Sequence, residues 1–156
     1  MVALRNKKAK IMKKYLVVIL LFSLFSACKT NKKMTENPDT NSASALEGTW
    51  QLNYLMAPGK SFEELYPDKK PEIKFELGEN RFSGNTSCNS FTGKLTLDGN
   101  KISFRDPYAM TKMMCPGDGE SVFTQTLNKV NTYVITDGNT LNFISGDMAI
   151  MRFTKK

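Results

Sequence analysis

From residue 46 onward, apolar and polar side chains alternate in short runs, which is the period of β-strands that bury one face. In the first run, Trp50, Leu52 and Tyr54 alternate with polar residues. Later runs repeat the pattern and are separated by segments rich in Gly, Asn and Asp. Together they predict about eight short strands, whose inward-facing residues are Trp50, Leu52, Ile73, Phe75, Leu77, Phe82, Leu95, Leu97, Ile102, Phe104, Leu141, Phe143, Met151 and Phe153.

Two Asp-Gly-Asn tripeptides, at residues 98–100 and 137–139, lie between such runs. Asp-Gly between alternating runs predicts a β-hairpin, because both turn positions tolerate a positive φ. Their similarity reflects shared turn chemistry and does not indicate a solenoid repeat.

Residues 119–130 have a helical period instead, with Val122 or Phe123, Leu127 and Val130 recurring on one face. Asp118 precedes this segment and is expected to cap the helix. Residues 57–71 contain three prolines and a glycine, so they predict a loop with one helical turn near residues 62–66.

The domain at residues 46–156 is therefore expected to be mainly β, with about eight antiparallel strands and one α-helix. So many short strands favour a barrel or a strongly curled sheet, with the helix over an open end or face. The apolar residues have enough bulk to fill a small barrel, and we expect a packed interior. An interior cavity of several hundred Å³ would instead favour ligand binding.

The N-terminal region has the layout of a secretory signal peptide over residues 1–27. A basic run ends at Lys14, an apolar run follows, and small residues precede Cys28. Met12 is an alternative start. Phe25-Ser26-Ala27-Cys28 resembles a bacterial lipobox, which predicts lipidation of Cys28; the alternative is an ordinary signal peptide, with Cys28 incidental.

Residues 28–45 are rich in Lys, Thr, Asn and Ser, which is typical of a flexible tether. An acylated Cys28 would therefore hold the domain beside a bacterial membrane. We expect it to face the periplasm or the cell exterior.

Charge gives little support to nucleic-acid binding. The net charge is +7, but residues 1–27 hold six of the 22 basic residues and no acid, which leaves 16 basic against 15 acidic residues. A nearly neutral domain has no strong attraction for phosphate backbones.

The chain contains no histidine, which excludes Ser-His-Asp and Cys-His catalysis and removes the commonest zinc ligand. It also lacks a phosphate-binding glycine loop. We therefore expect a non-enzymatic protein with no catalytic residues, no metal and no cofactor.

With Cys28 assigned to a lipid, Cys88 and Cys115 are the remaining cysteines. A secreted chain reaches an oxidising compartment, where paired thiols persist as disulfides. A Cys88–Cys115 bridge is the favoured prediction, and two buried free thiols are the alternative.

Met110, Met113, Met114 and Cys115 lie within six residues. Thioethers and a thiolate are ligands for Cu(I), so copper or redox handling is one hypothesis. The simpler interpretation is that these methionines fill an irregular gap in the core.

Several segments together resemble the META domain (HslJ-like) family, over nearly all of residues 47–154. They are Gly48-Thr49-Trp50-Gln51-Leu52, the Gly84–Gly93 segment with Cys88, Asn89 and Phe91, Leu97-Asp98-Gly99, Thr111-x-Met113-x-Cys115-Pro116 and Met151-Arg152-Phe153. The resemblance implies a small calycin-like antiparallel β-barrel, often in envelope lipoproteins linked to stress and antibiotic tolerance. It also assigns structural roles to Gly48, Trp50, Gly84, Gly93 and Arg152.

In calycins an arginine of the last strand lies over the tryptophan of the first, which would pair Arg152 with Trp50. Strand parity argues against this pair, since Met151 and Phe153 should point inward and Arg152 outward. Both arrangements remain open at the level of sequence.

Three functions remain. The first is a monomeric envelope module that binds an unidentified envelope protein through a contact surface formed by Asn89, Phe91, Tyr108, Met110 and Met113. The second is binding of a small apolar ligand inside the barrel, and the third is copper or redox handling. Phe62, Tyr66 and Tyr108 are predicted either to add aromatic surface or to fold back over a barrel end.

Overall fold

The computed structural model describes residues 43–156. The predicted signal peptide at residues 1–27, the lipidation at Cys28 and nearly all of the predicted tether lie outside the described residues. The described chain begins with α2 (Ala43–Leu46), shortly before the first expected strand.

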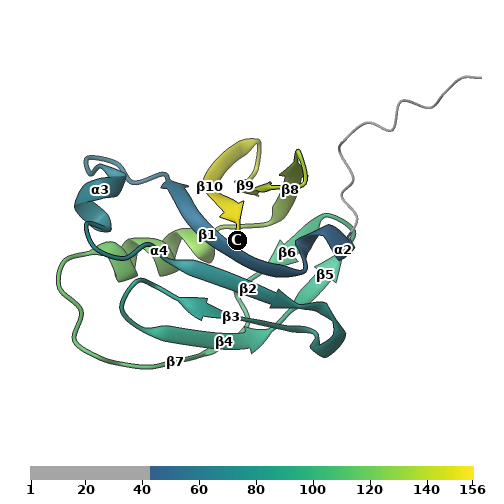
Figure 1. Cartoon of the computed structure of the whole chain (residues 1–156), viewed down its shortest axis with the longest axis horizontal. Helices are drawn as coiled ribbons and strands as arrows, with labels where there is room; N and C mark the ends of the chain where they lie inside the picture. Colours follow the sequence, from purple (N-terminus) through teal and green to yellow (C-terminus); the bar gives the residue numbers. More distant parts are fainter. Residues whose placement is uncertain (1–42) are drawn as a thin grey trace, which may run out of the picture. The chain divides into compact units, whose positions relative to one another are not determined.

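Ten antiparallel strands form a single curled sheet (Figure 1), in the order β5-β6-β8-β9-β10-β1-β2-β3-β4-β7. Each end strand pairs on one side only, so the sheet is a half-barrel. This agrees with the predicted mainly β, calycin-like architecture. The strands are β1 (Gly48–Leu55), β2 (Glu72–Glu76), β3 (Arg81–Asn85), β4 (Ser90–Lys94), β5 (Thr96–Asp98), β6 (Lys101–Ser103), β7 (Ala109–Met110), β8 (Thr132–Thr136), β9 (Thr140–Ser145) and β10 (Met148–Lys155).

The strand count exceeds the expected eight for two local reasons. The run expected around Leu95 is divided at that residue: β4 ends at Lys94, where it pairs with β3, and β5 begins at Thr96, where the chain pairs with β6 instead. The short strand β7 pairs with β4 at Phe91 and Thr92, and its two residues are too few to give a periodic signal.

Three α-helices occur among residues 43–156: α2, α3 (Phe62–Leu65) and α4 (Gly119–Leu127). A 3₁₀ turn at Leu77–Glu79 links β2 to β3. α4 is shorter than predicted, because Asn128 ends the helix and a turn follows. Asp118 occupies the N-cap position, as predicted, but its side chain makes no capping hydrogen bond and pairs with Lys60 instead.

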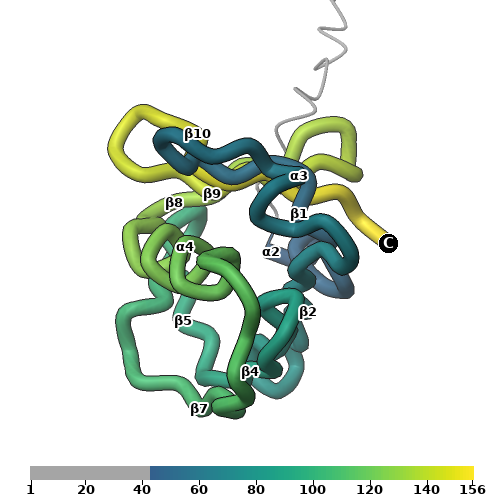
Figure 2. The backbone as a smooth tube through the Cα atoms, turned by 90° about the vertical axis from the view of Figure 1, so that its left-hand side faces the viewer, coloured from purple at the N-terminus to yellow at the C-terminus, as the bar shows by residue number. Residues whose placement is uncertain are grey.

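None of the helices at residues 43–156 is long and apolar enough to cross a bilayer. Figure 2 shows α4 in front of the opening that the curled sheet surrounds. Its Phe123 and Leu127 are buried, so the helix contributes its apolar face to the core, as predicted.

The interior is packed with side chains. Phe75, Phe104, Phe143 and Phe153 form a chain of ring contacts with centroids 5.1–6.5 Å apart. Of the 14 predicted inward-facing residues, all but Leu77 and Leu97 are buried, and these two pack against the core. The prediction of a filled barrel is confirmed, and binding of a ligand inside it gains no support.

Two glycines, one in β3 and one in β4, leave space for a phenyl ring of the neighbouring strand to lie over them. Gly84 lies opposite Phe91, and Gly93 lies opposite Phe82. A Cβ on Gly84 would lie 2.6 Å from the Phe91 ring, and a Cβ on Gly93 would lie 2.7 Å from the Phe82 ring. Each phenyl ring therefore covers the glycine opposite, and an alanine at either position has no room.

A lysine of the last strand packs over the tryptophan of the first strand. Trp50 is fully buried, and its indole N–H donates to the Leu46 carbonyl at 2.8 Å. Lys155, which lies directly opposite Trp50, places Nζ 5.1 Å from the ring centroid and donates to the Ala45 carbonyl. These contacts fasten α2 to the end of the sheet.

The predicted Arg152–Trp50 pair is therefore wrong. Arg152 lies opposite Tyr54, with its guanidinium carbon 5.5 Å from that ring. Strand parity correctly directed Arg152 outward, and an irregularity between Leu52 and Tyr54 shifts the β1–β10 register by one residue before Arg152 is reached. Gly48, with a φ of 108°, begins β1 in a conformation that favours glycine.

Candidate functional site

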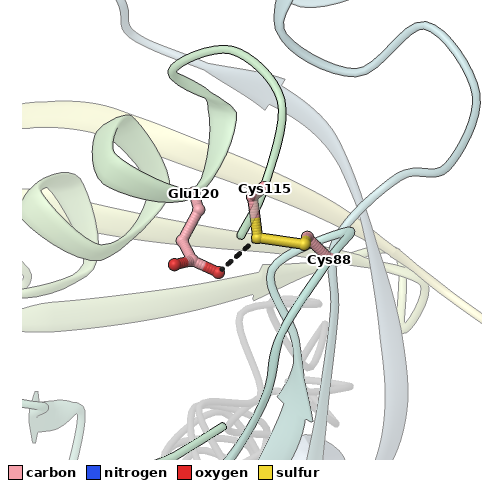
Figure 3. A group of neighbouring side chains, drawn as sticks. All are labelled: Cys88, Cys115 and Glu120. Carbon is pink, nitrogen blue, oxygen red and sulfur yellow. Dashed lines mark hydrogen bonds between the residues drawn. A yellow bond between two sulfur atoms is a disulfide. The ribbon is translucent and has the colours of Figure 1, made fainter. Parts of the chain in front are cut away.

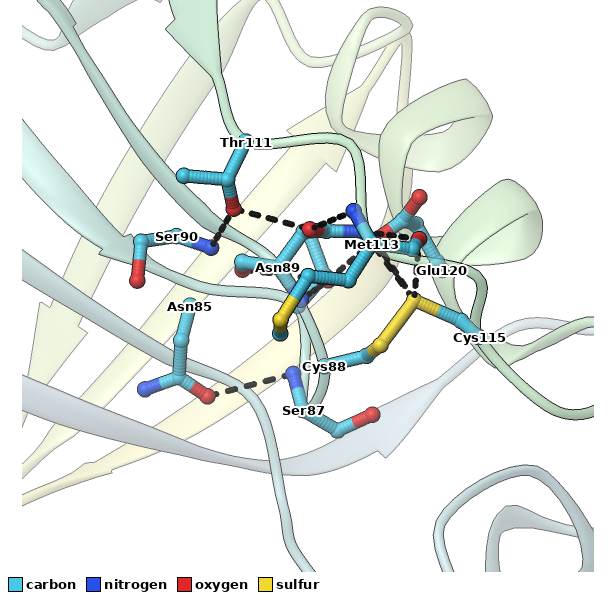
Figure 4. Close-up of a disulfide and its surroundings, with 10 residues drawn as sticks. Asn85, Ser87, Cys88, Asn89, Ser90, Thr111, Met113, Cys115 and Glu120 are labelled. Carbon is cyan, nitrogen blue, oxygen red and sulfur yellow. Dashed lines mark hydrogen bonds between the residues drawn. A yellow bond between two sulfur atoms is a disulfide. The ribbon is translucent and has the colours of Figure 1, made fainter.

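A disulfide joins two loops at one end of the sheet (Figure 4). Cys88 lies in the β3–β4 turn and Cys115 in the loop between β7 and α4, with Cα atoms 6.0 Å apart. The bridge predicted from the leader and the cysteine count is present, so the alternative of two free thiols is not observed. We call residues 111–118 the bridged loop.

The β3–β4 turn has a local cause. The Asn85 side-chain oxygen accepts from the Ser87 N–H at 3.1 Å, and the Thr86 N–H donates to the Asn89 carbonyl at 2.8 Å. Ser87 has a φ of 82°, which few non-glycine residues adopt. This tight turn places Cys88 at its tip, facing the bridged loop.

Asn89 connects the turn to the bridged loop. It is fully buried. Its side-chain oxygen accepts from the Met113 N–H and the Thr111 hydroxyl, both at 2.8 Å. Its amide nitrogen lies 3.0 Å from both the Met113 carbonyl and the Cys115 sulfur. One side chain thus fixes both backbone groups of Met113.

Glu120 lies in the first turn of α4 and points at the disulfide (Figure 3). Its Oε2 accepts from the Thr86 hydroxyl and the Asn89 amide, both at 2.8 Å, and lies 3.4 Å from the Cys115 sulfur. A disulfide sulfur carries no proton, so the last is a contact and not a hydrogen bond. Cys88, Cys115 and Glu120 thereby place three ligand atoms within 4.8 Å of one another.

A groove of about 580 Å³ opens beside the disulfide, between the chain after α3 and the bridged loop. Buried Tyr66 fixes its wall by donating from its hydroxyl to the Gly119 carbonyl at 2.8 Å. A Cβ on Gly119 would lie 2.6 Å from the Leu65 carbonyl oxygen, so only glycine fits. Burial raises the pKa of Tyr66 well above its usual value.

The predicted contact surface is corrected in part. Met113 is 61% exposed, and Tyr108 and Met110 are half-buried. Asn89 and Phe91 are buried, so their assignment to an exposed surface is wrong. Phe91 points inward because its ring covers Gly84.

Met114, which was not included in the predicted surface, is fully exposed and extends it beyond Met113. Of the predicted aromatic residues, Tyr66 folds back into the core, while Phe62 lies 5.2 Å from it between ring centroids. Tyr108 packs edge-on against Phe82 and Phe91, and burial, with a smaller effect of the Glu120 carboxylate, raises its pKa.

Two residues of this site escaped the sequence reasoning. They are Glu120, in the first turn of α4, and Thr86, in the β3–β4 turn. The sequence signal for Glu120 is weak, an acid five residues after Cys115 just inside a helix, and Thr86 has no signal beyond its place in a turn. The methionine and Cys115 set proposed for Cu(I) lacks an anionic ligand while Cys115 is oxidised.

Comparison with known proteins gives the family. The sequence profile of the META domain matches residues 43–156. The chain belongs to the META domain family. The match begins at α2, so the META domain includes the short helix that Trp50 and Lys155 hold in place.

Two solved structures are similar to this META domain. The first is the NMR structure of a protein from Burkholderia xenovorans, with 18% identity and a TM-score of 0.59, covering 77% of this chain and 90% of that chain. The second is the crystal structure of a DUF4847 family protein from Bacteroides vulgatus ATCC 8482, with 18% identity and a TM-score of 0.49, covering 71% and 94%. At these identities the first supports the fold alone. A search of curated protein sequences found no match.

Proposed function

We propose that this protein is a non-enzymatic envelope lipoprotein whose META domain binds a partner protein through the bridged loop and the groove beside it. The observation that carries the proposal is the rigid presentation of Met113 and Met114. The disulfide fixes Cys115, and Asn89 fixes both backbone groups of Met113. Two exposed methionines therefore project from a braced backbone.

A braced, exposed apolar loop has the properties of a protein contact. Exposed apolar side chains commonly mark interaction sites, and methionine adapts to irregular partner surfaces. Because the loop is already ordered, binding does not cost the entropy of ordering it. The groove of about 580 Å³ next to it offers a partner side chain a concave surface.

The proposed location is supported by the sequence of the leader and is consistent with the disulfide. A lipid at Cys28 would place the domain beside a bacterial membrane, and a disulfide persists in the oxidising space outside the cytoplasm. A role in stress or antibiotic tolerance is proposed only from the resemblance to the META family. The disulfide and the hydrogen bonds of the bridged loop do not depend on that role.

Photo-crosslinking in intact cells tests the proposed surface. A photoreactive amino acid replaces Met114, which is fully exposed, or Met148, which is 57% exposed at the start of β10. We expect a discrete crosslinked protein with Met114 and none with Met148. Equal crosslinking at both positions, or none at Met114, would contradict the proposal.

A separate experiment tests the anchor. Mass spectrometry of the membrane-extracted protein is expected to show an acylated N-terminal Cys28, and Cys28→Ser is expected to release the chain from the membrane. An unmodified N-terminus in the soluble fraction would contradict lipidation, while leaving the crosslinking result to be judged on its own.

A further inference from the structure

We propose that Cys88, Cys115 and Glu120 bind one Zn²⁺ ion when the disulfide is reduced to two thiols. Reduction frees two sulfur ligands beside a carboxylate that already faces them (Figure 3). Zinc binds cysteine sulfur and carboxylate oxygen. The site goes beyond the proposed partner binding and does not depend on it.

The distances suit a tetrahedral ion. With Zn–S near 2.3 Å and Zn–O near 2.1 Å, a tetrahedral site separates sulfur and oxygen by about 3.6 Å. The Cys115 sulfur and Glu120 Oε2 are already 3.4 Å apart. The two sulfurs need to separate to about 3.8 Å, and we expect rotation of the Cys88 side chain after reduction to provide this separation. The fourth position faces the groove and is open to water.

The surroundings of Glu120 also favour a cation. None of the ion pairs found among residues 43–156 includes Glu120, although its carboxylate is half-buried. The amide nitrogen of Asn89, which is fully buried, lies 2.8 Å from Glu120 Oε2 and 3.0 Å from the Cys115 sulfur. Such second-shell hydrogen bonds orient metal ligands. Two of the three ligands are therefore held in place before the ion arrives.

The redox step is an exchange with a dithiol donor. A donor thiolate attacks one sulfur of the Cys88–Cys115 bond, and its second thiol then resolves the mixed disulfide. Two electrons and two protons pass to Cys88 and Cys115, and the donor becomes a disulfide. Zn²⁺ then displaces the two thiol protons to solvent. The groove along the disulfide gives the donor access.

The carboxylate distinguishes zinc from Cu(I). Cu(I) is held by soft sulfur ligands and gains little from a carboxylate, whereas Zn²⁺ accepts both ligand types. The affinity of a zinc site should therefore depend on Glu120, and that of a copper site should not.

The test uses the full chain carrying Cys28→Ser, so that no third thiol contributes, after reduction with a phosphine under anaerobic conditions. Cd²⁺ is the optical probe, because its thiolate charge-transfer band reports sulfur binding, and Zn²⁺ competes with it. We expect one ion per reduced chain and none per oxidised chain. X-ray absorption of the zinc form should show two sulfurs near 2.3 Å and oxygen near 2.1 Å.

Two matched variants decide the role of the carboxylate. Glu120→Gln keeps the shape and the hydrogen-bond acceptor, and should weaken Zn²⁺ binding on the order of 100-fold. Asp68→Asn removes a carboxylate from the same groove, away from the sulfurs, and should leave binding unchanged. The competition is repeated in urea to measure binding by the unfolded chain.

Three results would contradict the proposed zinc site. They are no ion bound by the reduced chain, equal affinity in Glu120→Gln and the parent, or equal affinity in urea and in buffer. A preference for Cu(I) that is insensitive to Glu120→Gln would also overturn it, because a carboxylate ligand would then have no part in binding.

Discussion

The stability of the domain is predicted to depend strongly on the Cys88–Cys115 disulfide. The two cysteines are 27 residues apart, and closing a loop of this length stabilises the fold by about 3.5 kcal/mol in the chain-entropy model. The total free energy of unfolding of a small domain is only about 5–15 kcal/mol. Cys88→Ala/Cys115→Ala therefore removes a large share of it.

This free energy corresponds to a measurable change in melting temperature. For a domain of roughly 110 residues, the entropy of unfolding is about 0.23 kcal/mol/K, so a loss of about 3.5 kcal/mol lowers Tm by about 15 °C. Thermal and urea unfolding, followed by circular dichroism, measure both quantities. The urea m-value should also rise, because an unfolded chain without the crosslink exposes more surface.

Reductant provides the control. The parent with phosphine should melt at the same temperature as the double variant, and the variant should not respond to phosphine. A variant that melts within about 3 °C of the oxidised parent would refute the predicted stabilisation. An unchanged m-value with a large fall in Tm would instead refute the entropic explanation and assign the loss to native contacts around Asn89.

Three further predictions concern single residues. Tyr66→Phe loses the hydrogen bond to the Gly119 carbonyl and should cost about 1 kcal/mol at neutral pH. Because burial raises the pKa of Tyr66 above its ordinary value of 10.0, the parent should lose stability as pH rises beyond 10, and urea unfolding at several pH values should show a smaller loss in this variant. Gly84→Ala would force a Cβ against the Glu72 carbonyl and should lower the free energy of unfolding by about 1–3 kcal/mol, as measured by urea unfolding. An unchanged urea midpoint would contradict the close approach. Asn89→Ala leaves buried polar groups of the bridged loop unpaired and should cost about 2–4 kcal/mol, with faster hydrogen exchange confined to that loop; exchange at the parent rate would contradict its bracing role.

Periodicity alone was enough to predict most of this fold. The alternation around Trp50 and Phe75 reflects strands with one face in the core, and a period of two is visible over four or five residues. The Asp-Gly turns at 98–100 and 137–139 form hairpins because their glycines have positive φ values near 60°. The disulfide was predictable for a different reason. The leader indicates an oxidising compartment, and with Cys28 assigned to a lipid only Cys88 and Cys115 remain to form a pair.

The details of the site were not predictable, because they depend on register and burial. Asn89 in a turn-rich segment has the same sequence signal whether it faces solvent or is fully buried. Lys155 rather than Arg152 lies over Trp50 because the β1–β10 register places Lys155 opposite Trp50 and Arg152 opposite Tyr54, and the alternating pattern within each strand does not specify which residues of two strands lie opposite each other. Glu120 meets the disulfide only through the tertiary placement of α4.

The position of β10 in the sheet has a consequence for the order of folding. β10 pairs with β9 on one side and with β1 on the other, so it alone joins the group β5, β6, β8 and β9 to the group β1 to β4 and β7. Until residues 148–155 have left the ribosome, these two groups have no shared strand. Their contacts span nearly the whole domain, which slows folding. We therefore expect the sheet to close only after the last strand has been made, so that the two groups of strands remain separate for most of synthesis.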